Sequence, residues 1–423
     1  MISANFSGAF ERRMHLAATC FLCLIPAFLL FARGAADGAV VLIALLFLVR
    51  SAVHRDWSWV READIAVLLV IWLIMNLLVS PFAEFTGKSF GRSASWLRFV
   101  VFYAAVTRWV LADQKAIRAV CMAFLATIMI AAADALYQFF AGYSLLGGQH
   151  MNGRLTGPLD RPNIGIYLAK TGFATMTLAF ALYVADMKQK AFRVGIVVLA
   201  FALMIVFLSG ERTASVLSLL AIGCGLVGLF LVGGKSRLAA MGVAVLVLGG
   251  VGTLLTVSDR IFARAMAIGN VVGDYSGSIY GELSALGWRL FTEHPVTGTG
   301  MGNFGLVCPD YRAEGVIREC HPHPHNFYIE WLSDTGLVGT LPWLVFVAII
   351  VWAGVHHIRN GSRQSLVAGL YLGTLVLSFF PMAATQSAFS NWPAILAWNS
   401  IAVAVAALRL SQGRTRSSVN SSS

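Results

Sequence analysis

Apolar runs long enough to cross a bilayer follow one another along most of the chain, with polar segments between them. By the length that a bilayer requires, we distinguish about twelve such runs. They cover residues 14–32, 35–49, 65–80, 96–111, 119–140, 163–185, 194–209, 213–233, 238–257, 337–355, 366–385 and 394–410. Because a helix satisfies its own backbone polar groups in lipid, the pattern predicts an all-α polytopic membrane protein.

The polar segments carry a charge pattern that orients the chain in the membrane. Arg12 and Arg13 flank the first run, and every second connection after it is basic. The basic residues of these connections and of the C-terminal tail are Arg50, Arg55, Arg61, Lys115, Arg118, Lys188, Lys190, Arg193, Lys235, Arg237, Arg359, Arg363, Arg414 and Arg416. Since cytoplasmic loops carry the excess of Lys and Arg, we expect both termini in the cytoplasm and the other connections outside.

The composition changes the picture of possible partners. Of the 423 residues, 58% are hydrophobic and 12% are charged, and this charged fraction is about half that of a soluble protein. The basic cytoplasmic connections account for the net charge of +11, so we expect membrane lipids and no nucleic acid among the partners. The first run is long enough to remain as a span, so we expect no cleavable signal.

One polar segment, residues 258–336, is too polar to span the membrane and too long for a simple connection. It is expected to fold as a helical subdomain on the external side. The predicted organisation is therefore nine transmembrane helices in 1–257, the subdomain in 258–336 and three more transmembrane helices in 337–410. The Ser-rich residues 411–423 are expected to form a disordered cytoplasmic tail.

The end of that segment gathers histidines in front of an apolar run. Its sequence is His321-Pro-His-Pro-His325-Asn326, and the two prolines keep it extended. A helix is predicted to begin after them and to carry five residues on one face, at steps of three and four. These residues are His325, Tyr328, Leu332, Gly336 and Gly339. We expect the two glycines to let another backbone approach closely.

His325 is the candidate general base, because an imidazole can take up a proton near neutral pH. A histidine at a membrane interface is more often a hydrogen-bonded structural residue, and this interpretation stays open. A metal site is a further alternative, since His321, His323 and His325 alternate along an extended segment. The only acid-x-acid pair, Glu62 and Asp64, falls on the predicted cytoplasmic side. We therefore expect arginines, and no metal, to balance the charge of an anionic leaving group.

Two arginines are the first candidates for an anion. Arg212 follows Gly210-Glu211 in a tight external turn, where it can grip a phosphate, snorkel at the interface or pair with Glu211. Arg289 lies on a short amphipathic helix in the external segment. Further possible contacts on the same side are Arg154 and Asn163, chosen by position alone, and Arg98 and Lys170, because charges at their depth in a span are costly and usually line a polar cavity.

Two of the six cysteines, Cys308 and Cys320, bracket a polar part of the external segment. If this side faces an oxidising compartment, they are predicted to form a disulfide. The other four, Cys20, Cys23, Cys121 and Cys224, fall in apolar runs and are expected to act as small hydrophobic residues.

The pattern of His325-Asn326, nine residues and Gly336-x-x-Gly339 resembles the histidine motif of the O-antigen ligases, in the O-antigen ligase and polymerase superfamily. The arginine after Gly210-Glu211 and the pair Trp288-Arg289 also look like that family, although a serine usual before the first arginine is absent. Such ligases resemble C-type glycosyltransferases in fold. They move a glycan from undecaprenyl diphosphate onto the lipid A core outside the bacterial inner membrane, without a metal or another cofactor.

The resemblance implies a role for each of these residues. His325 would deprotonate the acceptor hydroxyl, Arg212 and Arg289 would hold the leaving diphosphate, and direct attack would invert the anomeric carbon. Asn326 and Tyr328 are further possible donor or acceptor contacts. The implied partners are undecaprenyl diphosphate-linked O-antigen and the lipid A core, at a site that faces the periplasm.

Three alternatives remain from the sequence. An O-antigen polymerase of the same superfamily would extend the glycan on its lipid carrier. A transporter of lipid-linked glycans is disfavoured, because the candidate charges lie on one side and do not line the midplane from both sides. A glycosyltransferase with a protein acceptor is the third alternative.

Overall fold

The computed structural model describes residues 2–147, 153–186, 189–257, 273–359, 362–381 and 387–420, together with residues 262, 263, 266 and 269. Within these residues the regular structure is helical and no β-strand occurs. Ten of the described helices are long and apolar enough to cross a membrane. The predicted class, an all-α polytopic membrane protein, is confirmed.

Twelve helices follow the twelve predicted runs. They are α1 (Ile2–Phe31), α2 (Arg33–His54), α3 (Ala63–Ile74), α4 (Thr86–Arg108), α5 (Gln114–Ala141), α6 (Ile164–Asp186), α7 (Gln189–Leu208), α8 (Arg212–Val232), α9 (Lys235–Val257), α13 (Phe327–Ile358), α14 (Arg363–Phe379) and α15 (Asn391–Asn420). Helices α7 and α14 are the two outside the ten long candidates. Helix α15 also takes in residues 411–420, which the sequence analysis assigns to a tail.

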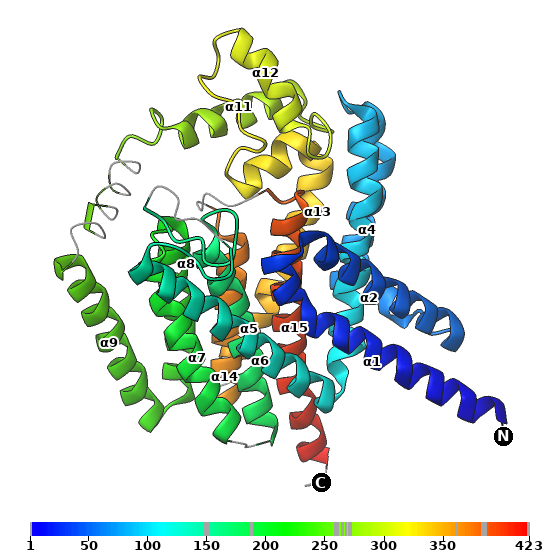
Figure 1. Cartoon of the computed structure of the whole chain (residues 1–423). Helices are drawn as coiled ribbons and strands as arrows, with labels where there is room; N and C mark the ends of the chain where they lie inside the picture. The colour runs from blue at the N-terminus through cyan, green and yellow to red at the C-terminus, as the bar shows by residue number, and fades with distance from the viewer. Residues whose placement is uncertain are drawn as a thin grey trace.

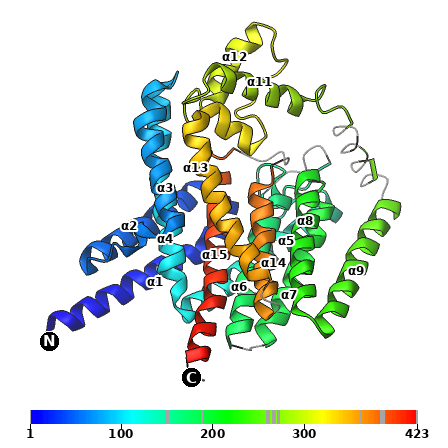
Figure 2. The same ribbon diagram turned by 180° about the vertical axis from the view of Figure 1, so that it is seen from behind.

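Two shorter helices, α11 (Ile279–Glu293) and α12 (Phe304–Ala313), precede α13. Figures 1 and 2 show them at one end of the helix bundle, above the start of α13, with both chain termini toward the opposite end. Short helical turns complete the connections: η1 (Ser58–Arg61), η2 (Met75–Val79), η3 (Ser80–Phe82) and η4 (Val110–Ala112). The part of the predicted subdomain between residues 258 and 272 lies largely outside the described residues.

An aromatic column joins α4, α13 and α15 in the core. The rings of Trp331 and Trp343 stack with centroids 4.6 Å apart and an interplanar angle of 9°. Trp96 contacts Trp331 at 6.4 Å and Trp398 at 5.7 Å, both edge to face. Such pairs contribute about 0.5–1.5 kcal/mol each beyond the area they bury.

Close glycine contacts bring α8 against α14. A Cβ atom at Gly228 would lie 2.4 Å from the carbonyl oxygen of Ser365, and one at Gly369 would lie 2.5 Å from that of Cys224. Small residues permit this approach, which membrane helices use because apolar burial against lipid gives little driving force.

Helix α13 is broken at Gly336, where the backbone has φ 57° and ψ −161°. After the break, the amide of Leu337 donates to the carbonyl of Pro295 at 2.9 Å. Before the break, the carbonyls of Ser333 and Asp334 accept from the amides of Thr299 and Gly300, at 2.8 and 2.9 Å. Residues 295–300 therefore supply the partners that the interrupted helix lacks.

This geometry corrects the expected helix face. Helix α13 begins at Phe327, so His325 precedes it, and the break at Gly336 separates Tyr328 from Gly339. The backbone that approaches Gly336 belongs to residues 296–298, since a Cβ there would lie 2.3 Å from the carbonyl oxygen of Val296. A Cβ at Gly339 would instead meet the Thr335 side chain of the same helix.

Two buried carboxylates on the first half of α13 hold neighbouring loops. Asp334 accepts from the amides of Gly302 at 2.7 Å and Phe304 at 3.1 Å, at the start of α12. Glu330 accepts from the amide of Ala388 at 2.7 Å and from the hydroxyl of Ser387, ahead of α15. Both carboxylates satisfy backbone groups that are otherwise costly to bury.

We predict that Gly336→Ala destabilises the detergent-solubilised protein, because the added Cβ meets the backbone of Val296 at a positive φ. Strain of this kind costs about 1–3 kcal/mol, and the thermal unfolding midpoint should fall by several degrees. Gly242→Ala on α9 is the matched control, since a Cβ there has no atom within 4 Å. Equal midpoints for the two variants would contradict the role of Gly336.

Candidate active site

His325 lies two residues before α13, and its backbone has an unusual conformation. Its φ of 54° is left-handed, which is unusual for a side chain other than glycine. The next residue, Asn326, is the N-cap of α13, and its side-chain oxygen accepts from the amides of Tyr328 and Ile329 at 3.0 and 3.2 Å. The His325 side chain is therefore attached directly before the N-cap residue of α13.

The three histidines of the motif form one cluster. The Nε2 atom of His325 lies 3.1 Å from Nδ1 of His321, and the amide of His325 donates to Nδ1 of His323 at 3.2 Å. The ring of Tyr280, on α11, contacts the His325 ring edge to face at 5.7 Å. Burial, together with the nearby His325 and His321, lowers the pKa of His323 from 6.5 to about 3, so His323 stays neutral and can accept.

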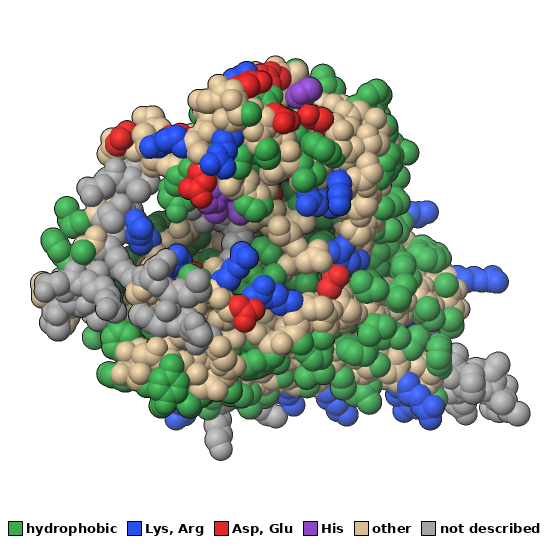
Figure 3. Space-filling model, turned by 45° about the horizontal axis from the view of Figure 1, so that its top comes forward, with side chains coloured by type: hydrophobic (Ala, Val, Ile, Leu, Met, Phe, Trp, Pro, Cys, Tyr) green, Lys and Arg blue, Asp and Glu red, His purple; other side chains and the backbone are tan. Residues whose placement is uncertain are grey.

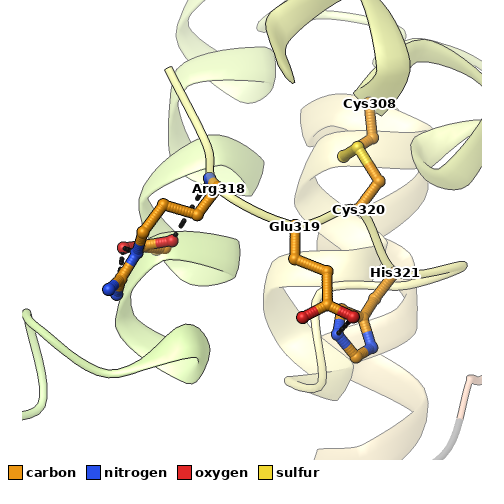
Figure 4. Close-up of a disulfide and its surroundings, with 6 residues drawn as sticks. Cys308, Arg318, Glu319, Cys320 and His321 are labelled. Atoms are coloured by element: carbon orange, nitrogen blue, oxygen red, sulfur yellow. Dashed lines mark hydrogen bonds and ion pairs between the residues drawn. A yellow bond between two sulfur atoms is a disulfide. The ribbon is translucent and has the colours of Figure 1, made fainter. Parts of the chain in front are cut away.

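The cluster ends on a carboxylate. Glu319 lies 3.8 Å from Nε2 of His321, and Figure 4 shows the two side chains facing each other. The hydrogen bond between Nε2 of His325 and Nδ1 of His321 can run in either direction, because the tautomer of each ring decides which nitrogen donates. If Nε2 of His325 is the donor, Nδ1 is the ring nitrogen that can take up a proton.

The same contacts bear on the metal alternative. Among the described residues, no group of three or more His, Cys, Asp or Glu side chains is arranged to hold a metal ion. The direct hydrogen bond between His321 and His325 also occupies nitrogens that a shared ion would need.

A disulfide fixes the segment that leads to the histidines. Cys308, buried on α12, is bonded to Cys320, next to His321 (Figure 4). Arg318 turns away from this cluster, since it pairs with Glu282 at the start of α11 and donates to the carbonyl of Gly277 at 2.9 Å. A link of this kind typically contributes about 2–4 kcal/mol to stability.

Cationic groups gather where α6 and α8 begin. The buried carboxylate of Glu211, the N-cap residue of α8, accepts from the amides of Gly165 and Ile166 in the first turn of α6. Arg154 interacts electrostatically with this carboxylate and donates to the carbonyl of Pro162 at 3.2 Å. Exposed Arg212 is the next residue after Glu211, so Arg154 and Arg212 lie at one place beside a helix N-terminus.

Burial raises the pKa of Glu211 to about 7, while the two amides and Arg154 act in the opposite direction. Because it accepts from the first amides of α6, the Glu211 carboxylate acts as the cap of that helix. Glu211 and Gly165 are 46 residues apart in the sequence. The unusual residue before Arg212 thus has a structural explanation.

Asn163 directly precedes α6, and Lys170 lies nearly two turns into the same helix. The carbonyl of Asn163 accepts from the amide of Tyr167 at 3.1 Å. Lys170 is buried on α6 and lines a narrow pocket with Phe327 and Ser387, among others. Since Phe327 is the first residue of α13, this pocket brings a lysine close to the segment that carries His325.

Arg289 is directed elsewhere. Its Nε donates to Glu293 at 2.8 Å, its Nη2 lies 3.7 Å from Glu314, and its guanidinium lies 5.0 Å from the centre of the Tyr311 ring. Tyr280, which contacts His325, is nine residues earlier on α11, and that spacing puts the two side chains on opposite sides of a helix. The proposed contact of Arg289 with a diphosphate requires these pairs to open, and it stays a prediction.

Two other predicted contacts are engaged within the protein. Arg98 pairs with Asp37 and donates to the side chain of Asn391, both at 2.9 Å. The Tyr328 hydroxyl donates to the carbonyl of Phe379 at 2.9 Å, at the end of α14. Tyr328 therefore ties α13 to α14, whereas Arg98 lies beside a second pocket.

Figure 3 shows a hollow between the α11–α12 end and the membrane helices. Histidine side chains lie at its upper edge, and Lys and Arg side chains gather along its lower edge. Imidazole groups can act as bases and cations can stabilise an anionic leaving group, so the hollow holds side chains that could serve a transfer reaction.

Residues 195–344 match the family model of the O-antigen ligases. This part of the chain is similar to the O-antigen ligase superfamily. The matched segment of this O-antigen ligase domain includes Arg212, Arg289 and His325, and it ends beyond the break at Gly336. A search of curated proteins found no match to the chain. The match supports the resemblance predicted from the histidine motif over these residues, and the glycosyltransferases of that family include both ligases and polymerases.

Three residues that hold the site together were not predicted from the sequence. Glu330 and Asp334 are acids four residues apart in a mostly apolar stretch, and that isolation is a usable signal. Arg92, which donates to the carbonyl of Gly302, lies ahead of the apolar run at 96–111 and had no such signal.

Glu211 gives a pH-dependent prediction. Because its pKa is raised from 4.5 to about 7, its contribution to stability is present below pH 4.5 and is lost as the pH rises through 7. As the pH rises from roughly 5 to 8, the thermal unfolding midpoint of the parent protein should therefore fall more steeply than that of Glu211→Gln. Glu314→Gln, at an exposed position, should keep the parent slope. Identical slopes for the parent and Glu211→Gln would refute the assignment.

Proposed function

We propose that this protein is an O-antigen ligase that moves O-antigen polysaccharide from undecaprenyl diphosphate onto the lipid A core, which completes lipopolysaccharide. The observation that carries the proposal is the His325–His321–Glu319 chain of contacts inside the matched domain. The reaction takes place at the periplasmic face of the bacterial inner membrane, with both termini in the cytoplasm. It is metal-independent and inverts the anomeric carbon.

In the proposed step, Nδ1 of His325 takes the proton of the acceptor hydroxyl. The hydroxyl oxygen forms a bond to the anomeric carbon on the face opposite to the leaving group. The bond from that carbon to the diphosphate oxygen breaks, and the diphosphate leaves with the electron pair. Attack from the opposite face accounts for the inversion.

The leaving diphosphate needs positive charge where its own charge grows. Arg154, Arg212 and the first turn of α6 lie together, and Lys170 lies further along the same helix, near the start of α13. We assign this group to the donor diphosphate. Arg289 would join it from α11 once its pairs with Glu293 and Glu314 exchange for the substrate.

A polymerase of the same superfamily would use the same chemistry on a different acceptor. The family match covers both activities, so the acceptor that is consumed separates them. Purified protein is reconstituted with lipid-linked O-antigen and, in parallel, with lipid A core or with a second lipid-linked glycan. Consumption of lipid A core supports the ligase, and chain growth on the lipid carrier alone supports the polymerase.

We predict that His325→Ala removes transfer by a factor of at least about 100, as expected for a lost general base, while the protein remains in the membrane. Transfer by the parent protein in excess EDTA is expected to be complete. Tyr137→Phe, a change in an exposed residue of α5, is the control for handling and insertion. Near-normal transfer by His325→Ala with both purified lipids would remove the base assignment.

Arg212→Lys is predicted to be badly impaired, because an ammonium group cannot form the two parallel hydrogen bonds of a guanidinium with a phosphate. The loss should be seen in transfer from the diphosphate donor at saturating acceptor. Arg237→Lys at the start of α9, near the predicted cytoplasmic side, is the matched substitution and should transfer normally. Equal rates for the two variants would argue against phosphate contact by Arg212.

A further inference from the structure

A second pocket with cationic walls lies beside α4. It is lined by Arg92, Ser95, Arg98 and Phe99 from α4 and by Phe389, Ser390 and Asn391 from the segment that leads into α15. Its volume is about 220 Å³, several times the roughly 30 Å³ that one water molecule occupies in the liquid. The pocket therefore has room for a group as large as a phosphate.

The charges of this pocket favour an anion. Both ionisable residues in its lining are arginines. Arg98 is held by Asp37 and Asn391, which fixes its guanidinium in place. Arg92 is exposed, and within the described residues its side chain donates to the carbonyl of Gly302. A guanidinium has five N–H donors, so Arg92 retains donors for a ligand.

Two buried acidic residues lie near Arg92. Glu330 and Asp334 interact electrostatically with it, but each carboxylate is turned to backbone amides, at Ala388 and at Gly302 and Phe304. These contacts anchor the wall of the pocket and leave its open side to the arginines.

The position of the pocket along α4 indicates a lipid headgroup as its ligand. The first part of α4, residues 86–95, is polar and includes Lys88 and Arg92, whereas the helix is mostly apolar from Trp96 onward. Arg92, Ser95 and Phe99 share one face at steps of three and four, so a single ligand would meet charge first and an aromatic wall below it. Exposed Phe82, Phe85 and Phe90 surround the turn into α4, as aromatic residues do at a membrane interface.

The segment before α15 connects this pocket with the pocket of Lys170. Ser387 and Ala388 line the Lys170 pocket, and Phe389, Ser390 and Asn391 line the pocket of Arg92 and Arg98. Glu330 bonds the same segment to the first half of α13. Two cationic pockets thus lie along one short segment that is fixed to the helix after His325.

We propose that the pocket of Arg92 and Arg98 binds a phosphate group of the acceptor, a phosphorylated glycolipid, while the Arg154–Arg212 region takes the donor diphosphate. This inference rests on the proposed function, because it assigns the second of the two lipids. It gives the enzyme separate phosphate sites for two lipid substrates that would otherwise compete for one.

The test adds a negative charge to the pocket without removing an arginine. Ser95→Asp is expected to raise the KM for lipid A core by about tenfold, as a like charge in contact with a phosphate would, with the KM for the donor unchanged. Ala94→Asp adds the same charge to the next, exposed residue of α4, outside the pocket lining. It should raise the acceptor KM less than threefold. Ser95→Asn has about the size of Ser95→Asp without its charge. Its KM for lipid A core should lie near that of Ala94→Asp.

Binding is measured separately from transfer, with lipid A core and its enzymatically dephosphorylated form in detergent micelles. The parent protein should bind the phosphorylated form about tenfold more tightly, and Ser95→Asp should lose this preference. Inorganic phosphate at millimolar concentration should not displace the lipid. Displacement by inorganic phosphate would indicate a site for the free anion and overturn the assignment.

The two hypotheses fail in different ways. If lipid A core is not consumed but the phosphate preference and its loss in Ser95→Asp persist, the ligase proposal is wrong and the lipid site stands. If transfer proceeds while Ser95→Asp and Ala94→Asp show equal acceptor KM values, or dephosphorylation leaves binding unchanged, the inference is overturned.

Discussion

The first half of α13 is held in place mainly by backbone hydrogen bonds that are completed from outside the helix. Asp334 accepts amides at the start of α12, and Glu330 accepts an amide ahead of α15. At Gly336 the helix opens, and residues 295–300 supply the missing partners. In an apolar environment each unpaired backbone group is costly, so these contacts fix where the segment can lie.

This constraint determines the geometry of the site. His325 emerges at the start of the segment that Glu330 and Asp334 anchor, and the disulfide at Cys320 holds its approach from the other side. The α11–α12 end and the membrane helices therefore meet across a hollow (Figure 3). Movement of α13 relative to either part would move His325, and the polar contacts of Glu330 and Asp334 limit such movement.

Much of the fold follows from the sequence, because apolar length and loop charge are local properties. The long-range contacts cannot be predicted in this way, because they join residues far apart in the sequence. Glu211 caps a helix that begins 47 residues before it, and nothing near Glu211 in the sequence names that partner. Gly336 looks like a helix-packing glycine in an apolar run, whereas its positive φ comes from the loop at 295–300. Arg289 was placed correctly on a helix, but Tyr311 and Glu314 set its direction.

In the proposed mechanism, a base that is not in contact with the arginines has a chemical advantage. A guanidinium in contact with an imidazole would disfavour its protonation and weaken it as a base. His325 is instead hydrogen-bonded to His321, whose Nε2 atom lies 3.8 Å from the carboxylate of Glu319. The cations near Glu211 lie on another pair of helices, α6 and α8. In the proposed reaction, the acceptor hydroxyl would be activated at His325 and the diphosphate that leaves the donor would be stabilised by the cations, with neither group cancelling the effect of its counterpart.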